Sequence, residues 1–386
     1  MSITFSHVLK KVLTNNDIDN IIDIIIDNIV GFKLSYLECG VIYYGAYIPM
    51  CARNGLKKKR TRLTPKRIVW RIDWSSFIWI GKVKWRRFLQ PVEVVTFIGD
   101  WLDLQGGLYM DFAKKTPRLK APKGACDTHM HFYNAEFPSA PTALMTPPDS
   151  WVDGYCAIQD RLRLERVVVV QPTTYGTDNS CQLEAMKAFG TRARGVVVID
   201  TSTSDEELQR LDRLGVRGVR FHMLPGGAVP WDILEEVAAR VNNLGWHVQL
   251  QMNGRGFLER EELLKRLPCD LVVDHVGRFM GPVPTDDPAF KVLLRFLETG
   301  RCWVKLSAPY ESSVTGPPDW ADVAPEASAL AEAAPERMLW ASNWPHPGQK
   351  NPPDEADLLD LLLSWVDDEK VRDRILVDNP ALLYGF

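Results

Sequence analysis

The sequence is poor in cysteine and has no long apolar run. Its 386 residues include seven cysteines, none of them in a Cys-x-x-Cys pair; they stand at positions 39, 51, 126, 156, 181, 269 and 302. The odd number and wide spacing argue against a disulfide framework or a thiolate zinc site and favour a reducing compartment. No apolar run reaches the roughly 18 residues of a membrane span, and the start of the chain lacks a secretory signal pattern. We therefore expect a cytoplasmic protein with no membrane partner.

Basic and acidic residues are unevenly distributed, although the net charge is only −3. Residues 1–120 contain 20 Lys/Arg and 10 Asp/Glu, whereas residues 121–386 contain 26 and 39. The basic excess is concentrated in residues 53–87, where 13 Lys/Arg are interleaved with four tryptophans and a single acidic residue. Such a split indicates two regions with different origins or partners.

Two interpretations of residues 53–87 are open. Basic residues mixed with aromatic rings can bind nucleic acid or an anionic membrane surface, which would make the chain a binding protein. The other interpretation is a solvated extension without a packed core. We favour the second and expect no nucleic-acid partner for the rest of the chain. Residues 1–110 are thus predicted to be an atypical basic N-terminal extension, either disordered or the product of an overcalled start with Met110 as the true initiator.

From residue 124 onward, short β-branched runs alternate with longer amphipathic stretches. Eight runs fit buried strands, at residues 124–129, 167–171, 195–200, 216–221, 247–252, 271–275, 303–307 and 338–343. Near-continuous apolar strands separated by helices indicate a parallel sheet covered by helices. Eight such units favour closure into a barrel. We therefore predict an α/β fold, a (β/α)8 TIM barrel over residues 121–386, preceded by the unrelated basic extension.

Histidines gather at the ends of these predicted strands. Five of the seven histidines fall at or just after strand ends: His129, His131, His222, His275 and His346. In a (β/α)8 barrel the active site lies at the carboxyl ends of the strands. Histidines distributed at random through a core would not be concentrated at strand ends, so the pattern predicts an active site. His247 begins its strand instead and is expected to be structural.

Three motifs resemble the amidohydrolase superfamily, in its amidohydrolase-2 (amidohydrolase-related) branch. They are the His-x-His pair after the first strand, the histidine after the sixth and the Trp-Pro-His segment after the eighth. The resemblance spans about residues 121–386 and does not extend into residues 1–110. Residues 171–179, 220–227 and 274–278 are most similar to the lactone-processing members, first the galactarolactone isomerases and then the 2-pyrone-4,6-dicarboxylate lactonases. The resemblance implies a barrel enzyme whose partner is a small carboxylated lactone.

The sequence departs from the metal-dependent members of that family. Those members complete the site with a further ligand after the fourth or fifth strand and an aspartate after the eighth, where this chain has Gln251 and Asn343. A neutral amide is a poor ligand for a divalent transition metal. His129, His131 and His275 could still hold zinc with an open fourth position. We expect the alternative, a site with no metal and no cofactor, because the lactone-processing relatives need none.

Four residues are predicted to be catalytic. Isomerising a lactone requires a group that takes a proton from the attacking hydroxyl and a group that returns one to the leaving ring oxygen. Imidazoles with a pKa near neutrality suit that exchange, which points to His129, His131 and His275. Asn343 can donate to the developing oxyanion. Since an amide cannot take a proton from water, Asn343 favours isomerisation over hydrolysis.

Other polar residues near strand ends are predicted to bind substrate. Arg220 and Arg278 lie in an acidic domain, which favours bidentate carboxylate binding; the alternative is a structural ion pair with Asp200 or Asp274. The remaining predicted contacts are Tyr175, Asn179, Gln251, Ser307, Tyr310 and His346. The expected reaction is isomerisation of a carboxylated sugar lactone, of the D-galactaro-1,5-lactone to 1,4-lactone type. The alternative is hydrolysis of a dicarboxylate lactone such as 2-pyrone-4,6-dicarboxylate.

Overall fold

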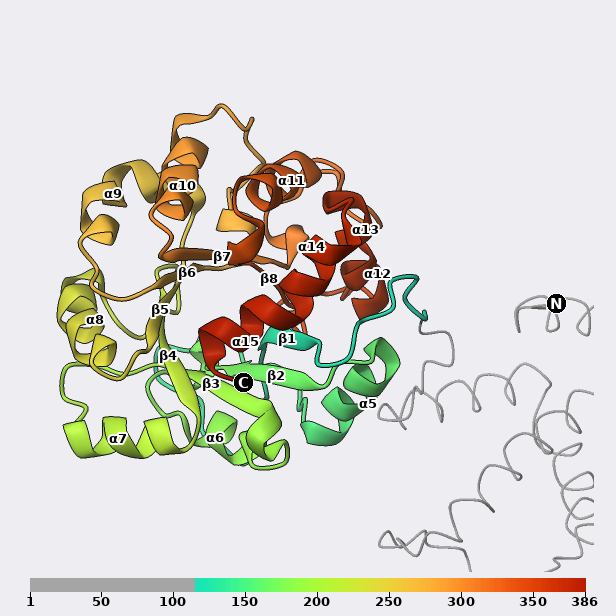
Figure 1. The fold of residues 1–386 in the computed structure, drawn as a ribbon. Helices are drawn as coiled ribbons and strands as arrows, with labels where there is room; N and C mark the ends of the chain where they lie inside the picture. The colour runs from blue at the N-terminus through green and yellow to red at the C-terminus, as the bar shows by residue number, and fades with distance from the viewer. Residues whose placement is uncertain (1–114) are drawn as a thin grey trace, which may run out of the picture. The chain divides into compact units, whose positions relative to one another are not determined.

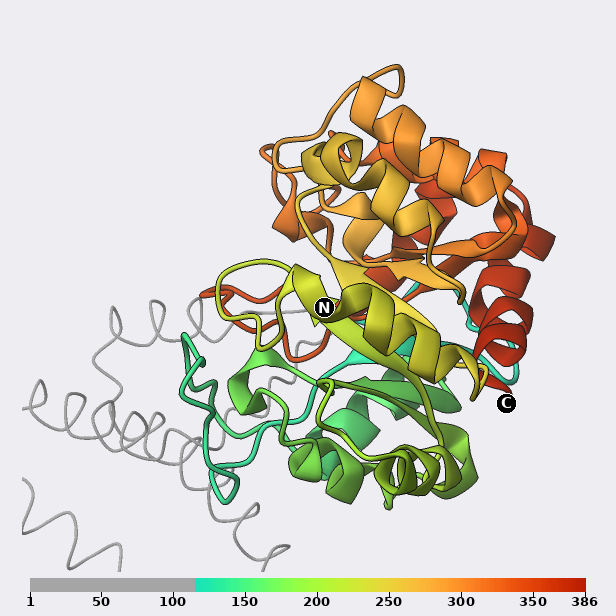
Figure 2. The same ribbon diagram turned by 90° about the vertical axis from the view of Figure 1, so that its left-hand side faces the viewer.

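The computed structural model describes residues 115–386. Residues 1–114, with the basic segment 53–87 and the whole predicted extension, lie outside the described residues. Within residues 115–386, eight parallel strands pair in chain order, and helices surround them (Figures 1 and 2). This arrangement confirms the predicted (β/α)8 barrel.

The strands coincide with the predicted apolar runs. They are β1 Cys126–Met130, β2 Arg166–Val170, β3 Ala193–Val197, β4 Val216–His222, β5 His247–Gln251, β6 Leu271–Val273, β7 Cys302–Leu306 and β8 Met338–Trp340. β6 and β8 end earlier than predicted, because the chain leaves the extended conformation at His275 (φ 56°) and Asn343 (φ 59°). Side chains with chemical functions therefore stand on the loops just beyond the strand ends.

The helices form an outer ring and a C-terminal extension (Figure 1). The helices between strands are α5 Val152–Leu162, α6 Ser180–Met186, α7 Asp205–Arg213, α8 Leu234–Asn242, α9 Phe257–Lys265, α10 Pro288–Glu298 and α11 Ala324–Ala333. After β8 come α12 Glu355–Asp360, α13 Leu362–Trp365, α14 Glu369–Asp373, the π-helical turn η9 Arg374–Asp378 and α15 Asn379–Tyr384. None of the helices within residues 115–386 has the length and apolar character needed to cross a bilayer.

Short 3-10 turns connect many of these elements. They are η2 Thr173–Tyr175, η3 Gly190–Arg192, η4 Trp231–Ile233, η5 Gly254–Gly256, η6 His275–Gly277, η7 Pro309–Glu311 and η8 Pro335–Arg337. Local sequence sets where the longer helices begin. Ser204 and Asp287 accept hydrogen bonds from the first turns of α7 and α10, and Pro288 follows as the first residue of α10. Such caps satisfy backbone N–H groups that have no partner within the helix.

Contacts between β1 and the segment after β8 close the barrel. The backbone N–H of Asn343 donates to His129 O at 2.8 Å, and that of His131 donates to Trp344 O at 2.9 Å. Asp127 lies buried at this seam and accepts hydrogen bonds from Ser342 and from Tyr155 of α5. Burial raises the pKa of Asp127, and these donors oppose the shift. The seam therefore fixes the His-x-His pair against the segment that carries Asn343.

Side chains inside the barrel change from apolar to polar along the strands. At the amino end, Trp303 packs with Tyr384 of α15 in an interior apolar cluster, and His247 lies against the Tyr384 ring, as expected of a structural histidine. Lys305 follows Trp303 by two residues in β7. Arg220 of β4 and Gln249 of β5 are paired in register. Since alternate residues of a strand point to one face, a polar layer lies between this cluster and the carboxyl end.

We expect the barrel to fold without the predicted extension. Residues 115–120 already pack against the C-terminal helices, where Lys115 binds Asp357 and Arg118 binds Asp360. A chain that begins at Met110 should therefore unfold cooperatively, with a Tm within a few degrees of the full-length value, as measured by circular dichroism. Loss of the cooperative transition in the shortened chain would contradict the predicted domain boundary.

Candidate active site

The segment after β6 holds an unusual backbone conformation. His275, Val276, Gly277 and Arg278 all have positive φ values, of 56°, 54°, 79° and 49°. A β-branched residue such as Val276 rarely adopts this conformation, and such strain persists only where the surrounding structure enforces it, often at functional sites. This turn directs Asp274 and His275 toward the carboxyl ends of the other strands.

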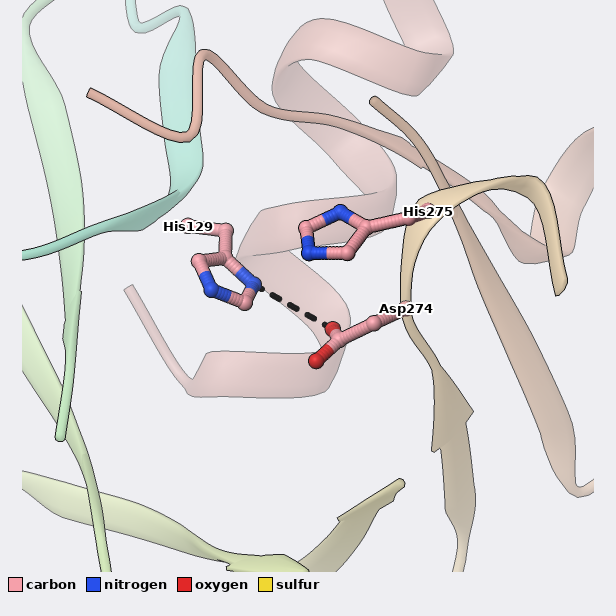
Figure 3. A group of neighbouring side chains, drawn as sticks. All are labelled: His129, Asp274 and His275. Carbon is pink, nitrogen blue, oxygen red and sulfur yellow. Dashed lines mark hydrogen bonds and ion pairs between the residues drawn. The ribbon is translucent and has the colours of Figure 1, made fainter. Parts of the chain in front are cut away.

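His129, Asp274 and His275 meet at the carboxyl end of the barrel (Figure 3). The Nδ1 atom of His129 lies 3.2 Å from Oδ1 of Asp274, and the ring centroids of His129 and His275 are 4.9 Å apart. All three side chains are buried. The two histidines are predicted from the sequence to be catalytic, whereas Asp274 is expected there only as an ion-pair partner.

Hydrogen bonds orient the His-x-His pair. The carbonyl oxygen of Val170 lies 2.8 Å from His131 Nδ1 and can only accept, so this nitrogen carries the proton. His131 Nε2 is then an acceptor, and His129 Nε2, 3.2 Å away, donates to it. His129 Nδ1 lies 3.2 Å both from Gln249 Nε2, which can donate, and from Asp274 Oδ1, which can only accept. These contacts orient both rings, and burial lowers the pKa of each, which favours the neutral imidazole.

Ser307 orients the third histidine. Its hydroxyl lies 3.0 Å from His275 Nδ1 and 3.4 Å from the carbonyl oxygen of Lys305. One arrangement satisfies both contacts, in which the hydroxyl donates to the carbonyl and accepts from Nδ1–H. Nε2 of His275 is then left without a proton and can act as a base.

Lys305 is a buried cation directly beneath the histidines. Its Nζ donates to Thr128 O at 2.8 Å and to Gln249 Oε1 at 2.7 Å, and it lies 3.6 Å from Asp274 Oδ1. Burial lowers the pKa of Lys305 to about 8, and Asp274 opposes the shift. Lys305 was missed as a site residue; the available signal was a charged residue in the middle of an otherwise apolar strand.

Burial also lowers the pKa of every histidine in this cluster. The pKa falls well below its usual value in His129 and His275, and to about 3 in His131 and His222. Lys305 and Arg220 add to the effect of burial on His129 by repulsion. The expectation of imidazoles that titrate near neutrality therefore does not describe the resting site, whose imidazoles are neutral.

Both arginines predicted to bind carboxylate already have protein partners. Arg220 donates from Nη1 to Gln171 O at 2.7 Å and from Nη2 to Gln251 Oε1 at 2.6 Å, and its Nε lies 4.0 Å from Asp274 Oδ2. Arg278 pairs with Glu311 at 3.0 Å, a residue that sequence analysis did not consider. Each Nη of Arg220 keeps one N–H for a ligand.

The other predicted substrate contacts divide into two sets. Tyr175 exchanges hydrogen bonds with the backbone of Asn134, and Asn179 bonds the backbone of Val198. Those partners hold loops together, and within residues 115–386 no hydrogen bond joins Tyr175 or Asn179 to the histidines. The second set, Gln251, Ser307, Tyr310 and His346, lies at or just beyond the ends of β5, β7 and β8, as does Asn343, which was predicted to be catalytic.

The cluster contains side chains that could hold a metal ion. One group of three potential ligands occurs among residues 115–386, formed by His129, Asp274 and His275, with ligand atoms within 4.8 Å of one another. Lys305 Nζ lies 3.4 Å from His129 Nδ1 and 3.6 Å from Asp274 Oδ1. A positive charge thus already stands beside two of the three ligand atoms.

Comparison with known proteins agrees with this geometry. Residues 126–386 match the family model described as Amidohydrolase. With its eight-stranded barrel and histidines at the strand ends, the chain belongs to the amidohydrolase family and is an enzyme of that family.

Among curated relatives, a 2-pyrone-4,6-dicarboxylate hydrolase of Comamonas testosteroni is 38% identical over 281 residues, which cover 69% of this chain and 92% of the relative. A D-galactarolactone isomerase of Agrobacterium fabrum is 35% identical over 273 residues, covering 69% and 93%. An apo crystal structure of an Agrobacterium tumefaciens protein superposes with a TM-score of 0.67 at 35% identity, covering 70% of this chain and 98% of that one.

The neutral buried histidines should make the fold sensitive to acid. Each imidazole has a folded pKa below its unfolded value of 6.5, so it is neutral in both states above that pH. Below pH 6.5 the unfolded chain binds protons that the folded chain does not, and stability falls until the pH reaches the folded pKa of about 3. In urea titrations between pH 6 and 5, His222→Gln should therefore reduce the slope of unfolding free energy against pH by about 1 kcal/mol per pH unit. An unchanged slope would mean that His222 titrates normally in the folded protein.

Proposed function

We propose that the protein isomerises a carboxylated sugar lactone, of the D-galactaro-1,5-lactone to 1,4-lactone type, without a metal ion. One observation carries the proposal: no carboxylate in the cluster is available to activate water. Asp274 is already bonded by Gln249 and faces Lys305, and Asn343 stands after β8. The relatives named as a lactone isomerase and a lactone hydrolase support a lactone as substrate.

Proton transfer is assigned to His275. A hydroxyl of the substrate attacks the lactone carbonyl carbon and gives its proton to Nε2 of His275, which forms a tetrahedral oxyanion and an imidazolium. When the carbonyl re-forms, the original ring C–O bond breaks and the same imidazolium returns the proton to the leaving oxygen. Both oxygens are bonded to one carbon, so one imidazole can serve both steps. Asp274 raises the pKa of His275 against the effect of burial and so favours the imidazolium.

The charge that develops on the carbonyl oxygen is stabilised from below. His129 Nε2–H is already donated to His131, so we assign the stabilisation of the oxyanion to the nearby buried cations. Lys305 donates its N–H groups to protein acceptors, so it stabilises the oxyanion through its positive charge. The positive charge of Arg220 acts in the same way. In a site this deeply buried, such charges are felt more strongly than in water.

The same charges support a reaction without metal. Asp274 faces two cations, Lys305 at 3.6 Å and Arg220 at 4.0 Å. A divalent ion bound by His129, Asp274 and His275 would place two further positive charges beside them in a buried site, at a large electrostatic cost. The donor set also lacks a second carboxylate, since the position after β8 is an amide. The residues present therefore do not fit a divalent ion.

Hydrolysis of a dicarboxylate lactone remains the second candidate, and the hydrolase relative favours it. Hydrolysis would use the same electrophile but would require a deprotonated water.

We further propose a cytoplasmic enzyme in which residues 1–110 are dispensable for catalysis. The five cysteines among the described residues are all free, which is consistent with a reducing compartment.

We expect chelation to leave the activity unchanged. D-galactaro-1,5-lactone followed by proton NMR should be converted mainly to the 1,4-lactone, and exhaustive treatment with chelator should change the rate by less than about twofold. The measurement also reports hydrolysis, because the open-chain acid gives separate signals. Stoichiometric zinc by elemental analysis, with activity lost on its removal and regained on its return, would overturn the metal-independent mechanism.

Asn343→Asp should divert the reaction toward hydrolysis. The substitution supplies a carboxylate that can take a proton from water, so water would compete with the substrate's own hydroxyl for the carbonyl. We expect the ratio of open-chain acid to rearranged lactone, read by NMR, to rise several-fold and to increase with pH as the new carboxylate ionises. If the unmodified enzyme already releases mainly open-chain acid, the hydrolase alternative is correct.

A further inference from the structure

A chain of hydrogen bonds runs from Asn343 away from the histidine cluster. Nδ2 of Asn343 donates to the Tyr310 hydroxyl at 2.8 Å, and that hydroxyl lies 2.9 Å from Nδ1 of His346. On the other side of the His346 ring, Nε2 lies 3.4 Å from Glu355 Oε1, and Arg161 binds the second oxygen of Glu355. The proposed mechanism does not use this chain, which we call the β7–β8 relay (Tyr310, His346 and Glu355).

The acceptor at the far end fixes the direction of every bond in the relay. A carboxylate bound by Arg161 accepts and does not donate, so His346 Nε2 carries its proton toward Glu355. In the neutral imidazole, His346 Nδ1 then has a lone pair, and the Tyr310 hydroxyl donates to it. The oxygen of Tyr310 is left to accept from the amide of Asn343. Reversing the amide would set two acceptors, Asn343 Oδ1 and the Tyr310 oxygen, against each other.

The opposite atom of the amide therefore has no protein partner. Oδ1 of Asn343 is buried, and no hydrogen bond reaches it within residues 115–386. Buried acceptors without a partner are rare in folded proteins and call for an explanation, of which a ligand is one. Asn343 is also held at φ 59° and its backbone N–H is bound by His129 O, so the side chain has little freedom to seek another donor.

We infer that Asn343 accepts a hydrogen bond from a hydroxyl group of the substrate, and that the β7–β8 relay positions it to do so. This inference rests on the proposed function and narrows its substrate class to lactones that carry free hydroxyl groups. A lactone without a hydroxyl leaves Oδ1 unsatisfied and binds more weakly. The role differs from the one expected from sequence, in which the amide donates to the oxyanion.

The relay can be tested without any substrate. In protein labelled with 15N-histidine, His346 should show the Nε2–H tautomer near pH 8, with its signals assigned by comparison with His346→Gln. Glu355→Gln provides a side chain that can donate to Nε2, which allows the relay to reverse, so the population should shift toward the Nδ1–H tautomer. An Nδ1–H tautomer in the unmodified protein would overturn the inference.

Substrate selectivity is tested by calorimetry on the full chain with two probes. D-glucaro-1,4-lactone carries hydroxyl groups, and 5-oxo-oxolane-2-carboxylate has the same lactone ring and a carboxylate without them. We expect tighter binding of the first probe, and roughly a tenfold loss of that preference in Asn343→Leu. Tyr310→Phe should reduce the preference several-fold by freeing the amide. Tyr384→Phe, the same change at the opposite end of the barrel, is the matched control and should leave it unchanged.

The outcomes separate this inference from the proposed function. Equal affinity for the two probes in the unmodified protein, or a preference that survives both Asn343→Leu and Tyr310→Phe, would overturn the role of Asn343 even if lactone is isomerised. If neither probe binds and no lactone is converted, the proposed function fails, and the assignment of Asn343 to a substrate hydroxyl fails with it. The tautomer measurement would still decide whether the relay has the stated direction.

Discussion

The structure of the site depends on one buried ion pair, between Asp274 and Lys305. Both side chains are excluded from solvent, and their charged atoms are 3.6 Å apart at the centre of the polar layer in the barrel. Taking two charges out of water is costly, and the cost is offset only when each charge has further hydrogen bonds. Gln249 provides them, because its amide donates to Asp274 and accepts from Lys305. Removing either charge would leave the other buried and unpaired.

Backbone strain at the strand ends is a second constraint. Asp274 occupies the last position before the left-handed turn of His275 to Arg278, so the ion pair anchors the start of that turn. Left-handed residues also follow β7 and β8, at Ala308, Asn343 and His346. At Asn343 and His346 the chain turns instead of continuing extended, and both side chains contact the Tyr310 hydroxyl. The strain is therefore part of how the site is assembled.

The barrel and the histidines at its strand ends could be predicted because both are encoded by local patterns. Runs such as residues 167–171 identify buried strands by composition alone, and eight of them at regular spacing define the fold. His129, His131 and His275 then follow from position. The partners of these residues are set by distant parts of the chain, and no local pattern places Lys305 under His129 or Glu311 beside Arg278. The pKa of the histidines was also misjudged, because burial by loops from several strands could not be known.

Asn343 shows how one barrel could serve both isomerisation and hydrolysis. The buried cations would polarise a lactone carbonyl in the same way for either nucleophile. What differs is whether the group after β8 can take a proton from water, as a carboxylate can, or only holds a hydroxyl in place, as an amide can. In this chain Tyr310 binds the donor atom of that amide, which leaves the acceptor atom for the substrate. Under the proposed mechanism, the choice of nucleophile thus rests on one side chain and on the hydrogen bonds that orient it, and the rest of the barrel is common to both reactions.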